Sequence, residues 1–310
     1  MDTRSDDKET LDLFDLVSMV WQNKLFIGAF TATFAFSSVI YSLLVTPVYT
    51  STALLSPKSG SSNGLAQMAS QYGALAGLAG VSLPTFSGGA NKTDVAIATL
   101  KSFSFFEEKL YEEVVVDLFA ADYWDGSQGN LVYDNDVYDE SNEKWLPTSD
   151  DQSSAKPTKQ ESYLAFSQLL RVSKDKQTDM VTIQVDHISP TVAQSWVARI
   201  LSELDDTMRQ RDLSNAESSI AYLTEQRAVT NIVALDDVFA SLIEEQLKNM
   251  TIAKASETYV FDIIDSPLAP EKRSWPRRAF ISALGTGIGA VLAIIIVFVM
   301  VAWRSKVKAR

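Results

Sequence analysis

The sequence contains no cysteine and only one histidine, and these two scarcities exclude several kinds of site. Without cysteine there is no disulfide, no thiol nucleophile and no thiolate ligand for a metal. His187 alone cannot form a cluster of histidine ligands, so a structural hydrogen-bonding role near the end of a strand is the default expectation for it. No phosphate-binding loop, nucleophile elbow or distinctive acid pair stands out. The sequence predicts a protein without cofactor or metal and gives no positive sign of catalysis.

Charged residues are missing from two long segments, Leu25 to Val45 and Ala279 to Trp303. Each segment is long enough to cross a hydrocarbon core of roughly 30 Å. The first has acidic flanks and no small-residue cleavage site, which is not typical of a cleaved signal. We predict two transmembrane helices, with residues 1–24 and 304–310 on one side of the membrane and an α/β domain of residues 46–278 on the other.

The distribution of charge bears on orientation and on partners. Seven basic residues lie in the two terminal segments (Arg4, Lys8, Lys24, Arg304, Lys306, Lys308, Arg310) and five lie on the other side of the spans (Lys58, Lys272, Arg273, Arg277, Arg278). This difference favours cytoplasmic termini only slightly. The net charge is −12 for the chain and −13 for the part between the spans, so the sequence predicts no nonspecific nucleic-acid binding.

Glycine and further proline are absent from the long stretch that follows Pro190 up to Ser256. Apolar residues recur there at steps of three and four, which predicts a long amphipathic helix over about 190–256. Ser214 and Glu217 have capping-box spacing, so a break near Asp212 is one alternative and two ordinary core helices are another. A helix of about 40 residues reaches roughly 60 Å. We therefore expect its stripe to need partners outside its own fold, with these residues facing other copies: Ile220, Leu223, Leu235 and Leu242.

The remaining segments predict a compact α/β base. Alternating or helical patterns favour these elements: a strand at 47–55, helix at 94–118, a short helix at 163–170, paired strands at 170–172 and 180–187, and a strand at 259–264. Pro267, Pro270 and Pro276 then deny the chain a helix and lead it, with Arg277 and Arg278, back into the membrane.

Two segments admit two interpretations each. Residues 11–21 carry an apolar stripe, which indicates either a helix lying in the headgroup region or an extension of the first span. Residues 60–89 interleave apolar residues with alanine, glycine and serine. This composition suits a mobile loop, or close contact with lipid or a neighbouring subunit.

Two local patterns imitate binding motifs. Asp134 to Glu140 invites a calcium interpretation, but the position that needs glycine holds Asp139, so a solvated acidic turn is favoured. Gly285 to Ala290 imitates a dinucleotide-binding loop but falls inside a span, where small residues let helices pack. The predicted small faces, for packing between the spans or with a partner, consist of Gly28, Ala32, Ala283, Gly285, Gly287 and Gly289.

In order and spacing, patterns along nearly the whole chain resemble the polysaccharide co-polymerases, the chain-length determinants of Wzz type. Near the first span the resemblance lies in 11–16, Trp21 and 47–53, and in the middle it lies in 65–83 and Trp145. The helical stretch contributes Ser189, Pro190, Ala193, Trp196, 219–223 and 242–246. The last part contributes 259–261, Ile264, Asp265, Pro267, Pro270, 276–278 and Ile281.

The resemblance implies an inner-membrane protein of a Gram-negative bacterium with a periplasmic base and a long helix. It implies a bell-shaped homo-oligomer, commonly an octamer, that acts with a membrane polymerase on lipid-linked polysaccharide and sets the modal length of lipopolysaccharide O-antigen. Some relatives add a cytoplasmic tyrosine kinase; only seven residues follow Trp303, so we expect none here.

Three other functions stay open. Capsule or exopolysaccharide polymerisation and export is an alternative within the same family. A transmembrane sensor shares the two-span plan but should continue into a signalling module. A membrane-tethered periplasmic carbohydrate hydrolase would need an acid and a base about 5 to 9.5 Å apart, which sequence does not test.

Overall fold

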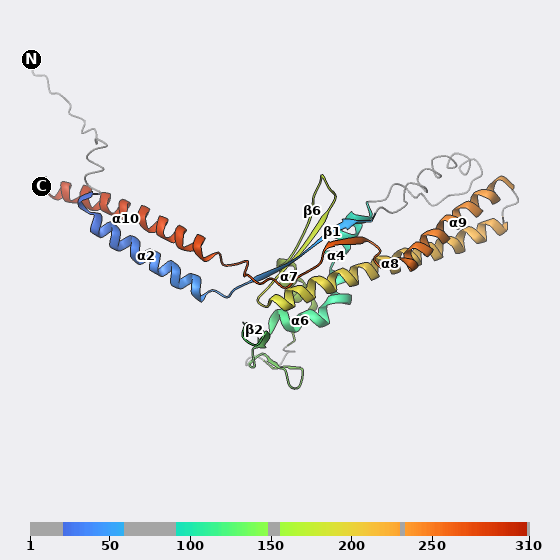
Figure 1. The fold of residues 1–310 in the computed structure, drawn as a ribbon, viewed down its shortest axis with the longest axis horizontal. Helices are drawn as coiled ribbons and strands as arrows, with labels where there is room; N and C mark the ends of the chain where they lie inside the picture. The colour runs from blue at the N-terminus through green and yellow to red at the C-terminus, as the bar shows by residue number, and fades with distance from the viewer. Residues whose placement is uncertain (1–20, 59–90, 148–155, 230–232, 309–310) are drawn as a thin grey trace, which may run out of the picture. The chain divides into compact units, whose positions relative to one another are not determined.

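The computed structural model describes residues 21–58, 91–147, 156–229 and 233–308. The chain forms two units, one of Met1–Val48 with Arg273–Arg310 and the other of Tyr49–Lys272. Apart from Trp21, the apolar stripe expected at 11–21 lies outside the described residues, and so does the whole 60–89 segment. The fold is the mixed helix and sheet class that the sequence predicts, with a long helix and two apolar helices near the chain ends (Figure 1).

A four-stranded sheet forms the centre of the Tyr49–Lys272 unit. Its order is β6 (Leu170–Lys174), β7 (Val181–His187), β1 (Tyr49–Pro57) and β8 (Phe261–Asp265), and every neighbouring pair is antiparallel. Ala53 lies opposite Ile183 and Leu55 opposite Val181, and none of the four is exposed. Side chains alternate between the two faces of a strand, so the alternating apolar residues all reach one face, where the core lies.

Helices cover the apolar face of this sheet. The predicted helix of 94–118 is a series of shorter pieces, α4 (Lys92–Leu100), α5 (Phe103–Phe105), a π-helical turn η1 (Phe106–Leu110) and α6 (Tyr111–Phe119). Ser102 separates α4 from α5, and its hydroxyl accepts a hydrogen bond from the backbone N–H of Phe105 at 3.3 Å. This capping favours a new helix start at that point. Helix α7 (Lys159–Leu169) adds Phe166, which packs on Phe106 and Trp196.

Short strands connect α6 to α7. They form two separate hairpins, β2 (Ala121–Asp125) with β3 (Asn130–Tyr133), and β4 (Tyr138–Asp139) with β5 (Lys144–Trp145). Aromatic rings hold them together, since Tyr138 packs edge-on against both Tyr133 and Trp145.

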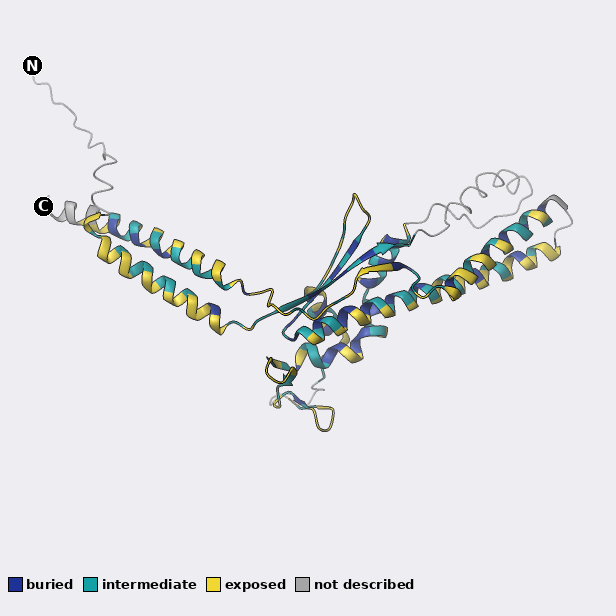
Figure 2. Ribbon diagram, viewed as in Figure 1, coloured by how far each residue is buried: buried dark blue, intermediate teal, exposed yellow. Residues whose placement is uncertain are grey.

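The stretch from 190 to 256 is two helices rather than one. Helix α8 (Pro190–Val229) is 40 residues long, and α9 (Val233–Ala255) returns along it (Figure 1). The alternative of a break near Asp212 is wrong, because α8 continues through that residue. Figure 2 shows buried residues along α8 both beside the sheet and beside α9. The stripe therefore has a partner within its own chain along its outer half, contrary to our expectation.

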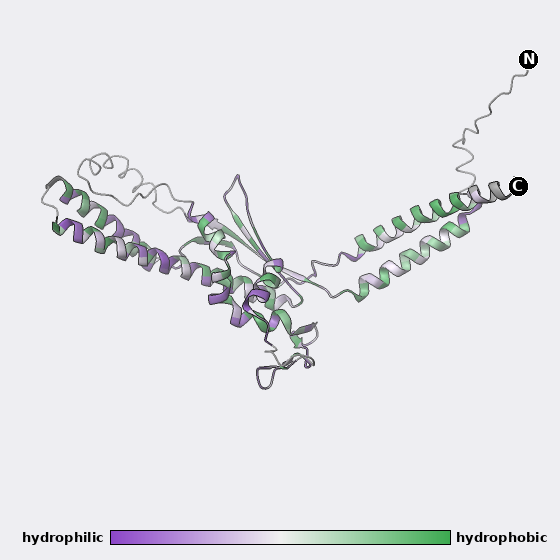
Figure 3. Ribbon diagram, turned by 180° about the vertical axis from the view of Figure 1, so that it is seen from behind, coloured by the Kyte–Doolittle hydropathy of each residue, from purple (hydrophilic) through white to green (hydrophobic). Residues whose placement is uncertain are grey.

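The other unit contains the two apolar helices, α2 (Lys24–Leu44) and α10 (Arg278–Lys308). They lie side by side and are hydrophobic over most of their length (Figure 3). Both are long and apolar enough to cross a membrane. Their positions agree with the two uncharged segments of the sequence.

Candidate functional site

Two glycines of α10 lie tightly against α2. A Cβ atom added to Gly285 would overlap the Cβ of Ser38, and one added to Gly289 would lie 2.6 Å from the Cβ of Phe34. Both positions are far closer than a van der Waals contact, so only glycine permits this approach of the two helices. The two glycines are four positions apart, which places them on the same face of α10.

The other small residues of the predicted faces lie elsewhere. An added Cβ at Gly28 or Gly287 would meet no atom within 4 Å, and Ala32 and Ala283 are exposed. The face of α2 that meets the two close-packed glycines is thus formed by Thr31, Phe34 and Ser38 instead of Gly28 and Ala32. Contact of Gly28, Ala32, Ala283 and Gly287 with a partner stays a prediction.

The segment that leads back to α10 is fixed at two places. Within the Tyr49–Lys272 unit, the carbonyl of Pro267 accepts a hydrogen bond from the Gln194 amide at 3.1 Å. Within the other unit, the Val48 N–H donates to the Trp275 carbonyl at 2.9 Å, and the Ser274 N–H donates to the Val48 carbonyl at 2.8 Å. This pairing joins the chain just after α2 to the chain just before α10. Pro276 is buried there, Pro270 is half-buried, and Arg277 and Arg278 follow where α10 starts.

Three of the four residues predicted to face other copies are buried inside the α8 and α9 hairpin. Leu223, Leu235 and Leu242 form a small core with Phe239, and each is at most 7% exposed. Ile220 is half-buried. The outer surface of the hairpin carries other exposed apolar side chains, namely Tyr222, Val229, Leu247 and Ile252.

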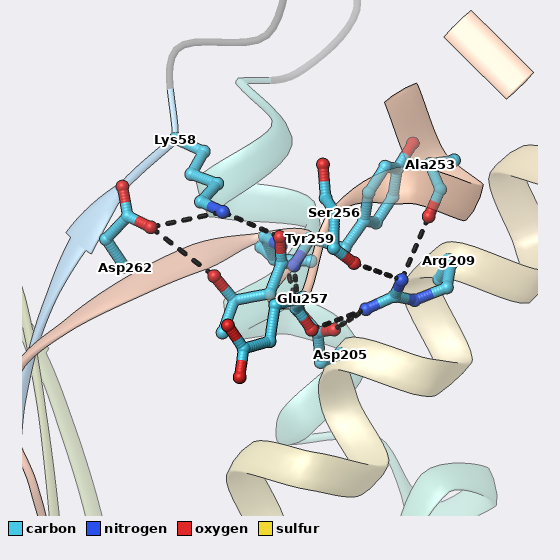
Figure 4. A network of polar contacts seen from close by, with 10 residues as sticks. Lys58, Asp205, Arg209, Ala253, Ser256, Glu257, Tyr259 and Asp262 are labelled. Carbon is cyan, nitrogen blue, oxygen red and sulfur yellow. Dashed lines mark hydrogen bonds and ion pairs between the residues drawn. The ribbon is translucent and has the colours of Figure 1, made fainter. Parts of the chain in front are cut away.

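A polar network closes the foot of this hairpin (Figure 4). The Arg209 guanidinium donates to the carbonyls of Ala253, Ser256 and Glu257 at 2.9, 2.6 and 3.0 Å. These carbonyls end α9, where backbone acceptors lack helical partners, so one side chain of α8 caps the end of α9. Arg209 also donates to Asp205 at 2.6 Å.

Asp205 extends the same network towards the sheet. Its Oδ1 accepts the backbone N–H groups of Tyr259 and Val260 at 2.6 and 2.9 Å, just before β8 begins. On the far side, Lys58 at the end of β1 donates to the Thr258 carbonyl at 2.7 Å and pairs with Asp262 at 3.1 Å. Nothing in the predicted site residues pointed to this cluster. The available signal was an Asp and an Arg four residues apart beside the apolar stripe.

Tyr259 joins the network from the turn before β8. Its hydroxyl donates to Asp212 at 2.6 Å, and Lys92 lies both 3.4 Å from the centre of its ring and 3.0 Å from Asp212. Burial and the neighbouring Asp212 carboxylate raise the pKa of Tyr259. Asp212, near which a helix break was one alternative, is instead an acceptor that fixes the turn before β8.

A cleft of about 290 Å³ lies beside this network, lined by Leu201, Asp205, Asp206, Glu257 and Phe261 among others. Carboxylates in a cleft are what a hydrolase would need. Here both oxygens of Asp205 accept structural hydrogen bonds, which leaves this carboxylate as part of the scaffold.

His187 lies at the end of β7 where α8 begins, and it is 6% exposed. Its Nδ1 accepts from the Ser189 N–H at 3.0 Å, so Nε2 carries the proton and donates to the Asp117 carbonyl at 3.1 Å. Ser189 in turn accepts from the Val192 N–H and caps α8. Burial lowers the pKa of His187 from its ordinary value of 6.5. The ring is a structural link between α6 and α8.

The remaining motif-like segments have structural roles. Asp134 accepts from the Asp136 N–H at 2.8 Å in a tight turn. Among the described residues, no three histidine, aspartate or glutamate side chains are placed to hold a metal ion. Gly285 to Ala290 lies inside α10.

Comparison with known proteins bears on this architecture. Residues 9–113 match the model of the Wzz family, described as chain length determinant protein. The resemblance to the Wzz family is confirmed. No curated protein matches this chain.

Solved structures give distant likenesses to this chain. A full-length bacterial polysaccharide co-polymerase is 14% identical with a TM-score of 0.43, over 95% of this chain and 99% of its own. A fragment of WzzB, a polysaccharide co-polymerase from Salmonella Typhimurium, is 16% identical with a TM-score of 0.29, over 74% and 100%. A point mutant of the Shigella flexneri lipopolysaccharide O-antigen chain-length regulator WzzBSF is 11% identical with a TM-score of 0.23, over 73% and 100%.

The glycine contacts predict opposite effects of alanine at neighbouring positions. Gly285→Ala and Gly289→Ala should destabilise the helix pair by about 1–3 kcal/mol, because each new methyl group overlaps α2. Gly287→Ala and Gly28→Ala should be neutral or stabilise by up to about 1 kcal/mol, because alanine favours helix and meets open space. Thermal unfolding of the full chain in detergent measures the difference, and equal behaviour of the two pairs would contradict the packing.

The two Arg–Asp pairs of the hairpin predict unequal losses. Arg209→Met should lower the free energy of unfolding by about 2–4 kcal/mol, because it leaves three carbonyls and Asp205 without their donor in a largely buried place. Arg227→Met, which removes the exposed pair with Asp236 near the hairpin tip, should change the free energy of unfolding far less, because solvent screens an exposed ion pair. Denaturant unfolding in detergent compares them; a similar loss in both would show that the network at the foot adds nothing.

Burial of neutral His187 predicts an acid-sensitive fold. The pKa of His187 is lower in the folded chain than the ordinary value of 6.5, so on acidification the unfolded chain binds a proton before the folded chain does. The free energy of unfolding is therefore highest above pH 6.5 and falls as the pH drops below that value. Melting temperatures should decrease from pH 7.5 to 5.5 more steeply in the native chain than in His187→Gln, which keeps a side-chain donor. Parallel pH profiles would mean that His187 does not cause the loss.

Proposed function

We propose that this protein is a non-catalytic regulator of polysaccharide chain length in the inner membrane. In this proposal α2 and α10 cross the bilayer, the termini are cytoplasmic and the Tyr49–Lys272 unit is periplasmic. The observation that carries the proposal is the Wzz family match over residues 9–113, in a chain whose two apolar helices flank a base with a long helical hairpin. Lipopolysaccharide O-antigen is the proposed product, and capsule or exopolysaccharide is the alternative.

The regulator acts as a homo-oligomeric scaffold. The hairpin, whose length is set by the 23 residues of α9 at about 35 Å, buries its inner leucines and leaves Tyr222, Leu247 and Ile252 on its surface. Rows of apolar side chains on such a surface suit contact with identical copies. Head-to-tail contacts between copies close into a ring, for which we infer an octamer from the family resemblance.

The membrane polymerase and its lipid-linked polysaccharide are the proposed partners. The intrachain contact occupies Gly285 and Gly289, so the open small faces at Gly28, Ala32, Ala283 and Gly287 are available to a further helix. Small residues let helices approach closely in a bilayer, where packing drives their association. We assign these four residues to the polymerase contact.

Gene deletion followed by gel analysis of the surface polysaccharides tests the function. Loss of the preferred chain length, with polymer still made, is expected for a regulator. Native protein expressed from a plasmid should restore the preferred chain length on the gel. The double variant Gly28→Leu with Gly287→Leu should be expressed and form oligomers of native size but should not restore that length. An unchanged ladder on deletion would overturn the proposal. A change confined to capsule would transfer it to the alternative product.

A further inference from the structure

The unit that contains α2 and α10 carries basic charge without acidic charge over its described residues. Neither 21–48 nor 273–308 contains an aspartate or a glutamate. Three arginines lie within six residues before and at the start of α10, namely Arg273, Arg277 and Arg278. Among the described residues none of the three forms an ion pair. These guanidinium groups therefore have no counterion from their own chain in the described part of it.

One of these arginines also has an unused buried donor. The Nε atom of Arg278 is buried and has no hydrogen-bond partner among the described residues. A buried N–H without an acceptor is costly, and for a charged group the cost is higher still. Nε is covered by the chain itself, so an anion outside the chain meets the terminal nitrogens of this guanidinium. The rest of the segment is held in place, since Val48 pairs with Ser274 and Trp275 through backbone hydrogen bonds.

The side of the membrane makes this cluster unusual. In the proposed topology the three arginines lie on the periplasmic side, directly before a span. Lys and Arg next to spans are normally enriched on the cytoplasmic side, so anchoring alone does not account for a concentration here. Trp275 is half exposed beside them, as is common for tryptophan at the level of the lipid headgroups.

We propose that Arg277 and Arg278, with Arg273, bind the pyrophosphate group of a lipid-linked glycan at the periplasmic membrane surface. Arginine binds phosphate oxygens through a planar pair of N–H donors, which gives both charge and geometry. A lipid pyrophosphate has a negative charge on each of two phosphates at the depth where α10 enters the bilayer. An ordinary phospholipid has a single phosphate and so matches three free guanidinium groups less well. This inference rests on the proposed function, because it names the substrate group that the co-polymerase holds.

Native mass spectrometry of the full chain in detergent tests the binding. The probes are farnesyl pyrophosphate, phosphatidylglycerol and phosphatidylcholine, each titrated separately. We expect farnesyl pyrophosphate to bind at least tenfold more tightly than phosphatidylglycerol, and phosphatidylcholine not to bind. Arg277→Gln with Arg278→Gln should weaken pyrophosphate binding at least tenfold, and the matching lysine pair should recover only part of it because lysine keeps the charge but not the planar donors.

Lys24→Gln is the matched control, since it removes one basic charge at the opposite end of α2 and should leave binding unchanged. Thermal unfolding of every variant confirms that the fold persists. Equal affinity for phosphatidylglycerol and the pyrophosphate would overturn the substrate assignment and leave a general anionic-lipid anchor. Undiminished binding by the glutamine pair would overturn the site. Neither result changes the polysaccharide length pattern that the gene-deletion experiment measures on gels. Failure of this inference is therefore distinguishable from failure of the proposed function.

Discussion

The apolar stripe of α8 is the constraint on which the rest of the structure depends. A 40-residue helix cannot remain in water with such a stripe uncovered, and two different partners cover it. Trp196, Ile200 and Leu204 pack in the core beneath the sheet, while Leu223 packs against α9. One rigid helix therefore belongs to both the base and the hairpin. The hairpin projects from the base without a flexible joint in α8.

Helix α8 changes its packing partner from the sheet to α9 near Asp205 and Arg209, where the hairpin meets the base. The contacts at this point are polar. Asp205 and Arg209 bind the backbone groups that become free where α9 ends and β8 has not yet begun. Apolar side chains could not satisfy these donors and acceptors, which explains why charged residues interrupt the stripe at this level. The same residues fix where β8 starts, and β8 precedes the segment that leads to α10. The network around Asp205 and Arg209 thereby fixes the position of the hairpin relative to the sheet.

Periodicity predicted the elements well and their partners less well. The strands and both apolar helices follow from local patterns, since Val181, Ile183 and Val185 alternate and two spans lack charge. The hairpin turn was missed because the apolar spacing continues on both sides of it and no glycine or proline marks it. Thr230, Asn231 and Ile232 only lower the helix propensity there. Burial of Leu223 against Leu235 and Leu242 could not be predicted without that turn, because on a single helix Leu235 lies about 18 Å along the axis from Leu223 and cannot touch it.

The glycines of α10 show why a small-residue pattern does not by itself identify a contact. Gly285, Gly287 and Gly289 are equivalent in sequence, yet successive residues on a helix point about 100° apart, so the middle glycine faces away from the other two. Gly285 and Gly289 determine how closely α2 lies, and Gly287 with Ala283 remains on the open side. The residues that pack against α2 and the residues of the open small face are therefore separate residues of α10. If a polymerase helix binds this chain, it can do so without disturbing the contact that holds α2 and α10 together.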